Sequence, residues 1–359
     1  MRINGGKHLL WPILAAAQVA CGSAALAERV DPNEWLSRMS TAVQTTSYEG
    51  TVIRIQDGRA EALKVVHTVA DGVIREKVVA QEGSGLEIIR IGNEVHCILP
   101  DRKSVLVEEW DDQSTLFSTL PSSEVRFGSE YDVAIVREER VAGRQAILVA
   151  IRPHDSYRYG HRVWLDIETA FPLQTQLISE NGDPIEQVKF ADISLNKDID
   201  ASALAPSYST ENFRWLTQPA RHVSHKLETS WASSDMPQGF RPVSTHGEIL
   251  PGNDAVVTHI LFSDGLANVS VFIAPQGSGA TEGPSRVGGL NSYSVIRDGH
   301  RITAVGEVPA MTVEQLATTI MRRGYPRPVN CRHADDARPN SLHPVRPYSR
   351  DRERQFCRF

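Results

Sequence analysis

The spacing of hydrophobic positions changes once near the start of the chain, from a helical period to a strand period. In "DPNEWLSRMSTAVQ", residues 31–44, apolar residues recur at intervals of three and four, the spacing of one buried helix face. These positions are Trp35, Leu36, Met39 and Val43. Asp31 stands at the N-cap position and is followed by Pro32 and Glu34, which is typical of a helix start. The pattern predicts one amphipathic helix here.

From Tyr48 onward, apolar and polar residues alternate in short runs, which indicates strands with one buried face. Turn signals separate the runs, and they favour tight hairpins because glycine tolerates positive φ angles. These signals are Asp57-Gly58, Asp71-Gly72, Gly92-Asn93, Asn181-Gly182, Asp264-Gly265 and Asp298-Gly299. The alternation slips by one residue near Ala191, which predicts a bulge or bend. We therefore expect an α+β fold, mostly antiparallel β, with a large and strongly curved sheet.

A polar stretch without periodicity divides this sheet from a second β-rich region. We predict an N-terminal domain over residues 28–197, a linker over 198–212 and a smaller α+β C-terminal domain over 213–324. "QGSGATEGPSRVGG", residues 276–289, indicates a mobile loop within the second domain.

The second domain is expected to close with a helix from Thr312 to Arg323. Thr312 and Gln315 form a capping-box pattern. The apolar stripe of this helix is Val313, Leu316, Ile320 and Met321.

The two ends of the chain differ from its body. Arg2 and Lys7 precede an apolar run and small residues, a pattern typical of a secretory signal over residues 1–27 with cleavage before Glu28. Lipidation at Cys21 is an alternative that Gln18 disfavours. The apolar run is short for a membrane span, so we expect an exported, soluble protein. Residues 325–359 hold eight Arg and five Pro with few aliphatic residues, which predicts disorder.

The charge is unevenly distributed. The chain carries a formal −6, the signal +2 and residues 325–359 +4, which leaves −12 for residues 28–324. Nucleic-acid binding depends on neutralising phosphates with Lys and Arg, so an acidic body argues against it. A basic peptide partner is favoured instead.

Few residue constellations point to an enzyme, and the usual nucleophile, metal and nucleotide motifs are missing from the sequence. Asp166 and Glu168 would lie roughly 6.5 Å apart on one strand face, a spacing that suits a glycosidase pair. The apolar alternation stops at Ile167, however, so we expect the strand to end there and the two acids to serve a turn.

Two further clusters have a chemical and a structural interpretation. His154, Asp155, Ser156 and His161 invite a catalytic triad, but triad members normally come from distant segments, so a hairpin tip is the favoured interpretation. On a helix, His222, His225 and Glu228 would share one metal-binding face. A solvated edge of the linker is favoured there. No cofactor and no metal are expected.

Five segments together resemble the RseB/MucB family of periplasmic regulators in sequence and order. They are "EWLSRMSTAVQTTSYEGTVI", "LEIIRIGNEVHCILP", "HRVWLDIETAFPLQTQLISENGDPIEQVKF", "MPQGF" and "LFSDGLANVSVFI". The resemblance covers nearly all of residues 28–323. The tail beyond Gly324 has no counterpart in this pattern.

This resemblance implies a non-enzymatic protein of the periplasm. The N-terminal domain would be a half-barrel like those of the lipoprotein carriers LolA and LolB. The protein would bind the periplasmic part of a single-pass anti-sigma factor, shield it from regulated proteolysis, and release it when lipopolysaccharide or another lipid binds. A periplasmic lipoprotein or lipid carrier is the alternative, and a secreted hydrolase acting through Asp166 and Glu168 is a third hypothesis.

Partner contacts are predicted at one hairpin and at the loop before Gly289. The predicted hairpin residues are Leu261, Phe262, Ser263, Asp264, Gly265 and Leu266. Lipid is expected at the N-terminal cleft and the groove between the domains. The oligomeric state, including a homo-oligomer, stays open.

Overall fold

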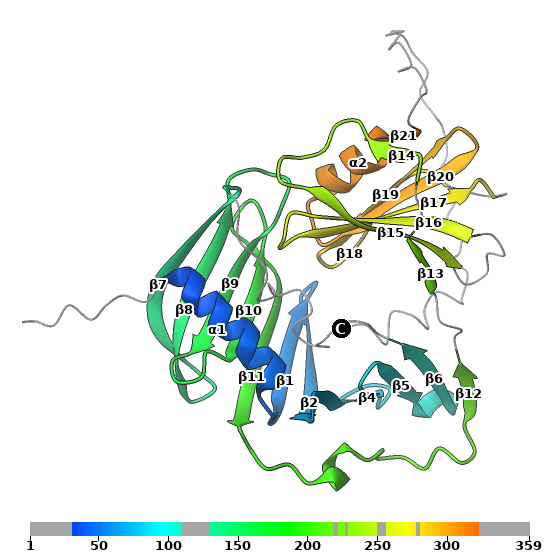
Figure 1. Cartoon of the computed structure of the whole chain (residues 1–359). Coiled ribbons are helices and arrows are strands. Elements are labelled where there is room, and N and C mark those ends of the chain that lie inside the picture. The colour runs from blue at the N-terminus through cyan, green and yellow to red at the C-terminus, as the bar shows by residue number, and fades with distance from the viewer. Residues whose placement is uncertain are drawn as a thin grey trace, which may run out of the picture. The chain divides into compact units, whose positions relative to one another are not determined.

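A computed structural model describes residues 31–109, 129–217, 222–226, 229–249, 256–277 and 281–322 (Figure 1). The described residues from Pro32 to Arg322 belong to one compact unit. The predicted signal peptide, its cleavage site and the tail 325–359 lie outside the described residues. In the part that is described, no helix is both long and apolar enough to cross a bilayer.

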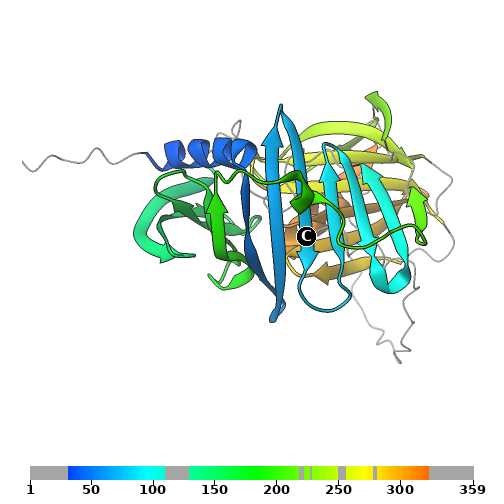
Figure 2. The same ribbon diagram turned by 90° about the horizontal axis from the view of Figure 1, so that it is seen from below.

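The N-terminal domain consists of helix α1 (Pro32–Thr45) and a twelve-stranded sheet. Its strands are β1 (Tyr48–Gln56), β2 (Arg59–Ala70), β3 (Val73–Ala80), β4 (Glu87–Ile91), β5 (Glu94–Leu99), β6 (Ser104–Glu109), β7 (Tyr131–Val141), β8 (Arg144–Pro153), β9 (Gly160–Asp166), β10 (Pro172–Ile178), β11 (Pro184–Leu195) and β12 (Arg214–Thr217). Figure 2 shows β1 to β6 side by side, coloured blue to cyan. The predicted first helix and the mostly antiparallel α+β class are confirmed.

The strand order is β12-β6-β5-β4-β3-β2-β1-β11-β10-β9-β8-β7. Strand β1 pairs with both β2 and β11 and so joins two antiparallel meanders. The apolar face of α1 contributes Trp35, Leu36, Met39 and Ala42 to the buried interior. The aromatic centre of this core is Tyr48, with Phe171 and Phe190 packed against it at ring distances of 4.8 and 5.8 Å.

Local turn chemistry formed the hairpins as expected. Both residues of Asp57-Gly58 have positive φ angles, 50° and 72°, and the Asp71-Gly72 and Asp298-Gly299 turns repeat this geometry. The predicted bulge is confirmed as well. Thr51 pairs with Asp192 and Val52 with Phe190, which leaves Ala191 without a partner opposite it in β1.

The predicted linker is tied to the sheet by one buried carboxylate. Glu87 accepts hydrogen bonds from the backbone N–H and hydroxyl of Ser207 at 3.0 to 3.1 Å, and Lys77 lies 2.9 Å from it. A 3-10 turn, η2 (Ala201–Leu204), lies within this segment. Beyond it, β12 pairs in parallel with β6, so the N-terminal sheet continues to Thr217, past the end of the predicted linker.

The C-terminal domain consists of a seven-stranded sheet, helix α2 (Ala310–Thr319) and a two-stranded ribbon. The sheet contains β13 (His222–Lys226), β15 (Arg241–Ile249), β16 (Val256–Ser263), β17 (Asn268–Pro275), β18 (Gly283–Val287), β19 (Leu290–Arg297) and β20 (His300–Gly306). The ribbon pairs β14 (Trp231–Ser233) with β21 (Ile320–Arg322). Val313, Leu316 and Ala317 of α2 pack against the sheet in one apolar core.

Two local predictions for this domain were wrong. Helix α2 begins at Ala310, after Pro309, so Thr312 lies inside its first turn and does not cap it. Ile320 and Met321 fit the helical stripe, yet they form β21, because pairing with β14 satisfies their backbone groups. Part of the predicted mobile loop is also ordered, since Gly283–Val287 forms edge strand β18 on β19.

Candidate functional site

The hairpin corner between β16 and β17 is built around Asp264. Its Oδ1 accepts hydrogen bonds from the backbone N–H groups of Leu266 and Ala267 at 2.9 and 2.8 Å. The Ser263 hydroxyl accepts from Gly265 N–H at 3.0 Å, and Gly265 has a φ angle of 108°. An aspartate in this position closes the turn with one oxygen and leaves the other to bind a different group.

That second oxygen binds the N-terminal domain. Arg158 Nη1 donates to Asp264 Oδ2 at 2.6 Å, and the Tyr131 hydroxyl donates to the same oxygen at 2.8 Å. The side chains of Arg158 and Asp264 are both 0% exposed. Burial, and then the Asp264 carboxylate, raise the pKa of Tyr131 far above its usual value, so its hydroxyl stays a donor.

The remaining donors of Arg158 are also occupied. Its Nε donates to Asp155 at 3.0 Å and its Nη2 donates to the Gln238 carbonyl at 2.5 Å. The rings of Tyr131 and Phe240 lie 5.4 and 5.1 Å from the guanidinium carbon. We call this set, Tyr131, Asp155, Arg158, Phe240 and Asp264, the arginine junction. A buried ion pair stabilises a fold only when its geometry and hydrogen bonds are complete, as they are here.

Neutral hydrogen bonds flank the arginine junction. Asn291 Nδ2 donates to the Tyr159 hydroxyl at 3.0 Å and to the Val308 carbonyl at 2.8 Å. The Thr312 hydroxyl donates to the Tyr157 carbonyl at 2.7 Å, which explains why this residue does not cap α2. The segment from Tyr157 to Tyr159 therefore holds the C-terminal domain at several points.

A second contact joins the domains through carboxylates. The Asp57 carboxylate accepts from Gly288 N–H at 3.2 Å, while Glu186 accepts from Arg54 at 2.9 Å and from Gln56 at 3.0 Å. Gly288 has a φ of +58°, and a Cβ atom there would lie 2.0 Å from the Gln56 amide nitrogen, so this position favours glycine.

Glu307 completes this second contact. Burial, and then the Glu186 carboxylate, raise the pKa of Glu307 to about 7, while Arg54 opposes the shift. We call Arg54, Gln56, Asp57, Glu186, Gly288 and Glu307 the carboxylate junction. Unlike the arginine junction, it brings like charges together.

Of the predicted partner-contact residues, Asp264 belongs to the arginine junction and the others lie beside it in the sequence. Phe262, Ser263 and Leu266 are buried, Leu261 and Gly265 are half-buried, and the Asp264 side chain is enclosed. Phe262 belongs to the core of the C-terminal domain. Sequence reasoning missed Arg158 as the partner of Asp264. The available signal was the position of Arg158 between two tyrosines in the hairpin tip "HDSYRYGH".

Asp166 and Glu168 occupy different environments. Asp166 ends β9 and is buried, and Arg144 Nε donates to it at 2.6 Å. The Glu168 side chain is 81% exposed and lies 3.1 Å from the same guanidinium. Burial would raise the pKa of Asp166, but hydrogen bonds from Arg144 and Thr169 lower it overall. Such a carboxylate cannot serve as a proton donor near neutral pH, and the predicted strand end and turn are confirmed.

The remaining predicted clusters are dispersed. His154 contacts Asp132 at 3.0 Å, Asp155 binds Arg158, and desolvation lowers the pKa of the half-buried His161 to about 4. These residues therefore form no triad. His222 and His225 lie on strand β13, so the helical metal face is wrong, and Glu228 lies outside the described residues. Across the described part of the chain, no three His, Cys, Asp or Glu side chains gather as a metal site.

A row of buried polar side chains crosses the core face of the N-terminal sheet. Residues opposite one another on neighbouring strands share a face, and here the register joins Tyr48, His67, Glu76, Arg90, Val95 and Glu108. His67 Nδ1 and Glu76 Oε2 lie 2.8 Å apart. Within the described residues, His67 Nε2 and Glu76 Oε1 have no hydrogen-bond partner. Sequence reasoning missed this row, although His67 and Glu76 interrupt the apolar alternation.

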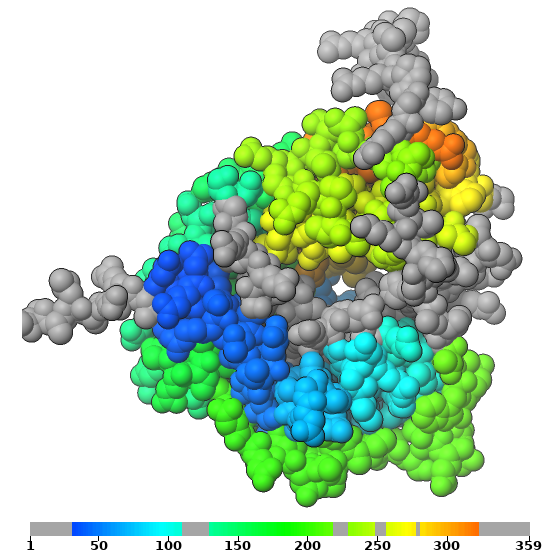
Figure 3. Space-filling model, in the orientation of Figure 1, coloured from blue at the N-terminus to red at the C-terminus, as the bar shows by residue number. Residues whose placement is uncertain are grey.

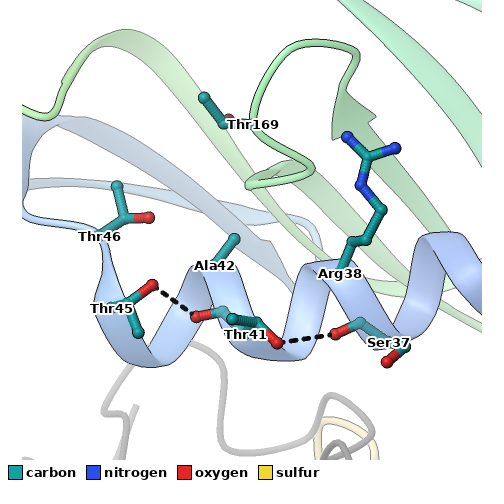
Figure 4. A pocket seen from close by; sticks show the side chains of 7 residues that line it. All are labelled: Ser37, Arg38, Thr41, Ala42, Thr45, Thr46 and Thr169. Atoms are coloured by element: carbon teal, nitrogen blue, oxygen red, sulfur yellow. Dashed lines mark hydrogen bonds between the residues drawn. The ribbon is translucent and has the colours of Figure 1, made fainter.

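A shallow hollow of about 320 Å³ lies between α1 and Thr169 of the turn after β9. Figure 3 shows α1 in blue at the surface. Figure 4 shows the lining of the hollow: Ser37, Arg38, Thr41, Ala42, Thr45, Thr46 and Thr169. The hydroxyls of Thr41 and Thr45 donate to carbonyls one helical turn earlier, at 3.2 and 2.8 Å. This polar lining does not suit an acyl chain.

Comparison with known proteins matches both domains to one family. Residues 31–208 match the model for the MucB/RseB N-terminal domain, and residues 225–321 match that for the MucB/RseB C-terminal domain. The chain is similar to the sigma factor AlgU regulatory protein MucB of Pseudomonas aeruginosa, with 29% identity over 299 residues, 82% of this chain and 92% of that protein. It is also similar to the sigma-E factor regulatory protein RseB of Escherichia coli K12, with 28% identity over 79% of this chain and 89% of that protein.

Solved structures agree with these matches. The crystal structure of MucB in complex with MucA(peri) superposes with a TM-score of 0.63 at 27% identity, covering 82% of this chain and all of that one. The Pseudomonas aeruginosa MucA/MucB complex gives a TM-score of 0.62 at 28% identity, with the same coverage. Both matched proteins were solved bound to a second protein.

Proposed function

Because the chain belongs to the MucB/RseB family of sigma-factor regulatory proteins, we propose that it binds the periplasmic region of a transmembrane anti-sigma factor and shields that region from regulated proteolysis. The observation that carries the proposal is the match of both family domains, in order, over residues 31–208 and 225–321. MucB, a relative at 29% identity, has been solved in complex with MucA. The family consists of regulators rather than enzymes.

We place the protein in the periplasm on two grounds. The first 27 residues have the composition of a secretory signal. The partner of the matched MucB structure is described as MucA(peri).

Charge supports the choice of partner. Residues 28–324 carry −12, which favours approach of a basic peptide segment through long-range attraction. We keep the proposal that Leu261 to Leu266 contact the partner, and the structure adds a condition to it. Because several of them are enclosed at the arginine junction, a partner reaches them only if the junction opens, and otherwise they act by fixing the orientation of the domains.

We further propose that lipid, including lipopolysaccharide, releases the partner. Supporting this step, the core face of the N-terminal sheet combines apolar side chains with the buried polar row. A ligand with apolar chains and hydrogen-bonding groups matches such a surface. Release follows if lipid and partner bind best to different domain arrangements, since each ligand shifts the population toward the arrangement it prefers.

A capture experiment tests both steps. The purified, exported protein is immobilised and exposed to inner-membrane extract of its host organism, with or without lipopolysaccharide micelles. We expect capture of one single-pass membrane protein, and less of it when lipopolysaccharide is present. A Glu168→Gln variant, altered at an exposed turn, should capture the same protein equally well.

The two outcomes are separable. Recovery of no single-pass membrane protein in either condition would contradict partner binding. Equal recovery with and without lipopolysaccharide would contradict the lipid step alone.

A further inference from the structure

Two histidines face one another on the C-terminal sheet, away from both junctions. His246 of β15 is opposite His259 of β16 in the strand register. His246 Nε2 and His259 Nδ1 lie 3.1 Å apart, and the two rings meet at 73° with centroids 4.6 Å apart. The ring of His259 stacks on Phe272 at 4.4 Å and 20°, which fixes its orientation.

The pair is on the side of the sheet opposite α2. Side chains alternate between faces along a strand. In β16, Ile260 and Phe262 belong to the core that α2 covers, so His259 between Thr258 and Ile260 points to the other side. Both histidines are half-buried, which leaves the site within reach of a solvated ion.

The distance between the two nitrogens suits a shared metal ion. Zinc binds imidazole nitrogen at about 2.0–2.1 Å with tetrahedral geometry, which places two such nitrogens roughly 3.3 Å apart. The observed 3.1 Å differs from this by a few tenths of an ångström. The distance between the two nitrogens therefore needs little change, and each ring must turn so that its lone pair points at the ion instead of at the other nitrogen.

We propose that His246 and His259 form a two-imidazole binding site for a nitrogen-preferring divalent cation of the zinc or copper class. Imidazole suits such ions, whereas magnesium and calcium prefer oxygen. The two rings share one hydrogen bond, so the ring that donates must move its proton to its other nitrogen before both lone pairs reach the ion. Both rings stay neutral, and water completes the coordination. The ion would cross-link β15 to β16.

Zinc titration of the full, untagged protein tests the site. After EDTA treatment and dialysis, isothermal titration should detect zinc binding, and thermal unfolding should shift upward with zinc. His246→Asn keeps a side chain able to hydrogen-bond, and His259→Phe keeps the stack on Phe272. Each should lower the zinc affinity of this site at least tenfold while leaving the metal-free melting temperature close to that of the parent.

His96→Asn is the matched control, since His96 also sits beside a polar partner, Glu94, at 2.7 Å on a strand surface. Its zinc affinity should equal that of the parent. Nitrogen-15 spectra of the parent give a second readout that needs no variant, because the signals of His246 and His259 should shift together on zinc addition. Unchanged zinc affinity in both variants, or signals of both residues that zinc leaves in place, would overturn the proposal.

Discussion

The arginine junction and the carboxylate junction join the same two domains with opposite electrostatics. In the first, the side chains of Arg158 and Asp264 are fully enclosed and paired. The guanidinium also donates to the Gln238 carbonyl and lies over the Phe240 ring. In the second, Glu307 lies near Glu186, and Arg54 is the cation that opposes its pKa shift. Enclosure stabilises charges only where partners compensate the loss of water. The buried charges of the first contact therefore compensate one another, and the second contact depends on the protonation of Glu307.

Removing one partner of the arginine junction should have the largest effect. Asp264→Ala leaves a buried guanidinium unpaired, which costs about 3–5 kcal/mol of unfolding free energy. Urea denaturation measures this loss. The double variant Arg158→Met with Asp264→Leu removes both charges and should recover most of it, because apolar side chains of similar volume replace a buried pair at little cost. A double variant as unstable as Asp264→Ala would show that hydrogen bonds to the corner, rather than the charge pair, hold this junction.

A smaller effect is expected at Gly288 of the carboxylate junction. Gly288→Ala adds a Cβ at a φ of +58° and 2.0 Å from the Gln56 amide nitrogen, so the Gln56 side chain must move and its hydrogen bond to Glu186 is disturbed. We expect a loss of roughly 2–3 kcal/mol, of which about 1–2 is backbone strain.

Gly299→Ala separates the backbone strain from the contact with Gln56. Its φ is +72° and nothing lies within 4 Å of the added Cβ, so it carries the strain alone. Equal losses for both variants in urea denaturation would mean that the contact with Gln56 contributes nothing.

The carboxylate junction should also depend on pH. The pKa of Glu307 is about 7 when the domains are in contact, chiefly through burial and then through Glu186. An exposed glutamate titrates near 4.3. The contact is therefore strongest below pH ~4.3, weakens between there and pH 7, and is constant above. The full shift from 4.3 to about 7 sets an upper limit of roughly 3–4 kcal/mol on this loss.

Glu307→Gln tests this assignment because it is neutral at every pH. Its stability at pH 8 should exceed that of the parent, and the two should converge at pH 4. If the parent and Glu307→Gln lose the same unfolding free energy between pH 4 and pH 8, Glu307 is not the titrating group.

The smallest loss of stability is expected at an exposed ion pair, which serves as a reference for both junctions. Arg144 and Glu168 form a pair whose carboxylate is 81% exposed, and such surface pairs contribute about 0–1 kcal/mol. Glu168→Gln should change the urea midpoint little. A loss comparable to that of Asp264→Ala would remove burial as the explanation for the difference between the junctions.

Local features of the fold were predictable from the sequence because short-range chemistry determines them. The Asp57-Gly58 turn, the bulge at Ala191 and the strand end at Asp166 each follow from a few neighbouring residues. The order of family segments indicated the fold class and the family, because that order reflects the whole chain.

Long-range pairing accounts for what was missed. Arg158 and Asp264 are 106 residues apart, and no local pattern joins them. Ile320 and Met321 fit the apolar spacing of a helix, but in the fold they pair with β14, which is distant in the sequence. Edge strand β18, nearly all exposed, lacks the alternation that marks a half-buried strand. The junctions therefore depend on tertiary context.

We propose above that the protein shields an anti-sigma factor from cleavage. The most direct measurement is the rate at which the site-one protease of the same organism cuts the periplasmic region of that anti-sigma factor, with and without saturating purified protein. The account predicts a rate at least tenfold lower with the protein, restored when lipopolysaccharide is added, and the same protection by Glu168→Gln. Cleavage at an equal rate in the presence and absence of the protein would contradict it.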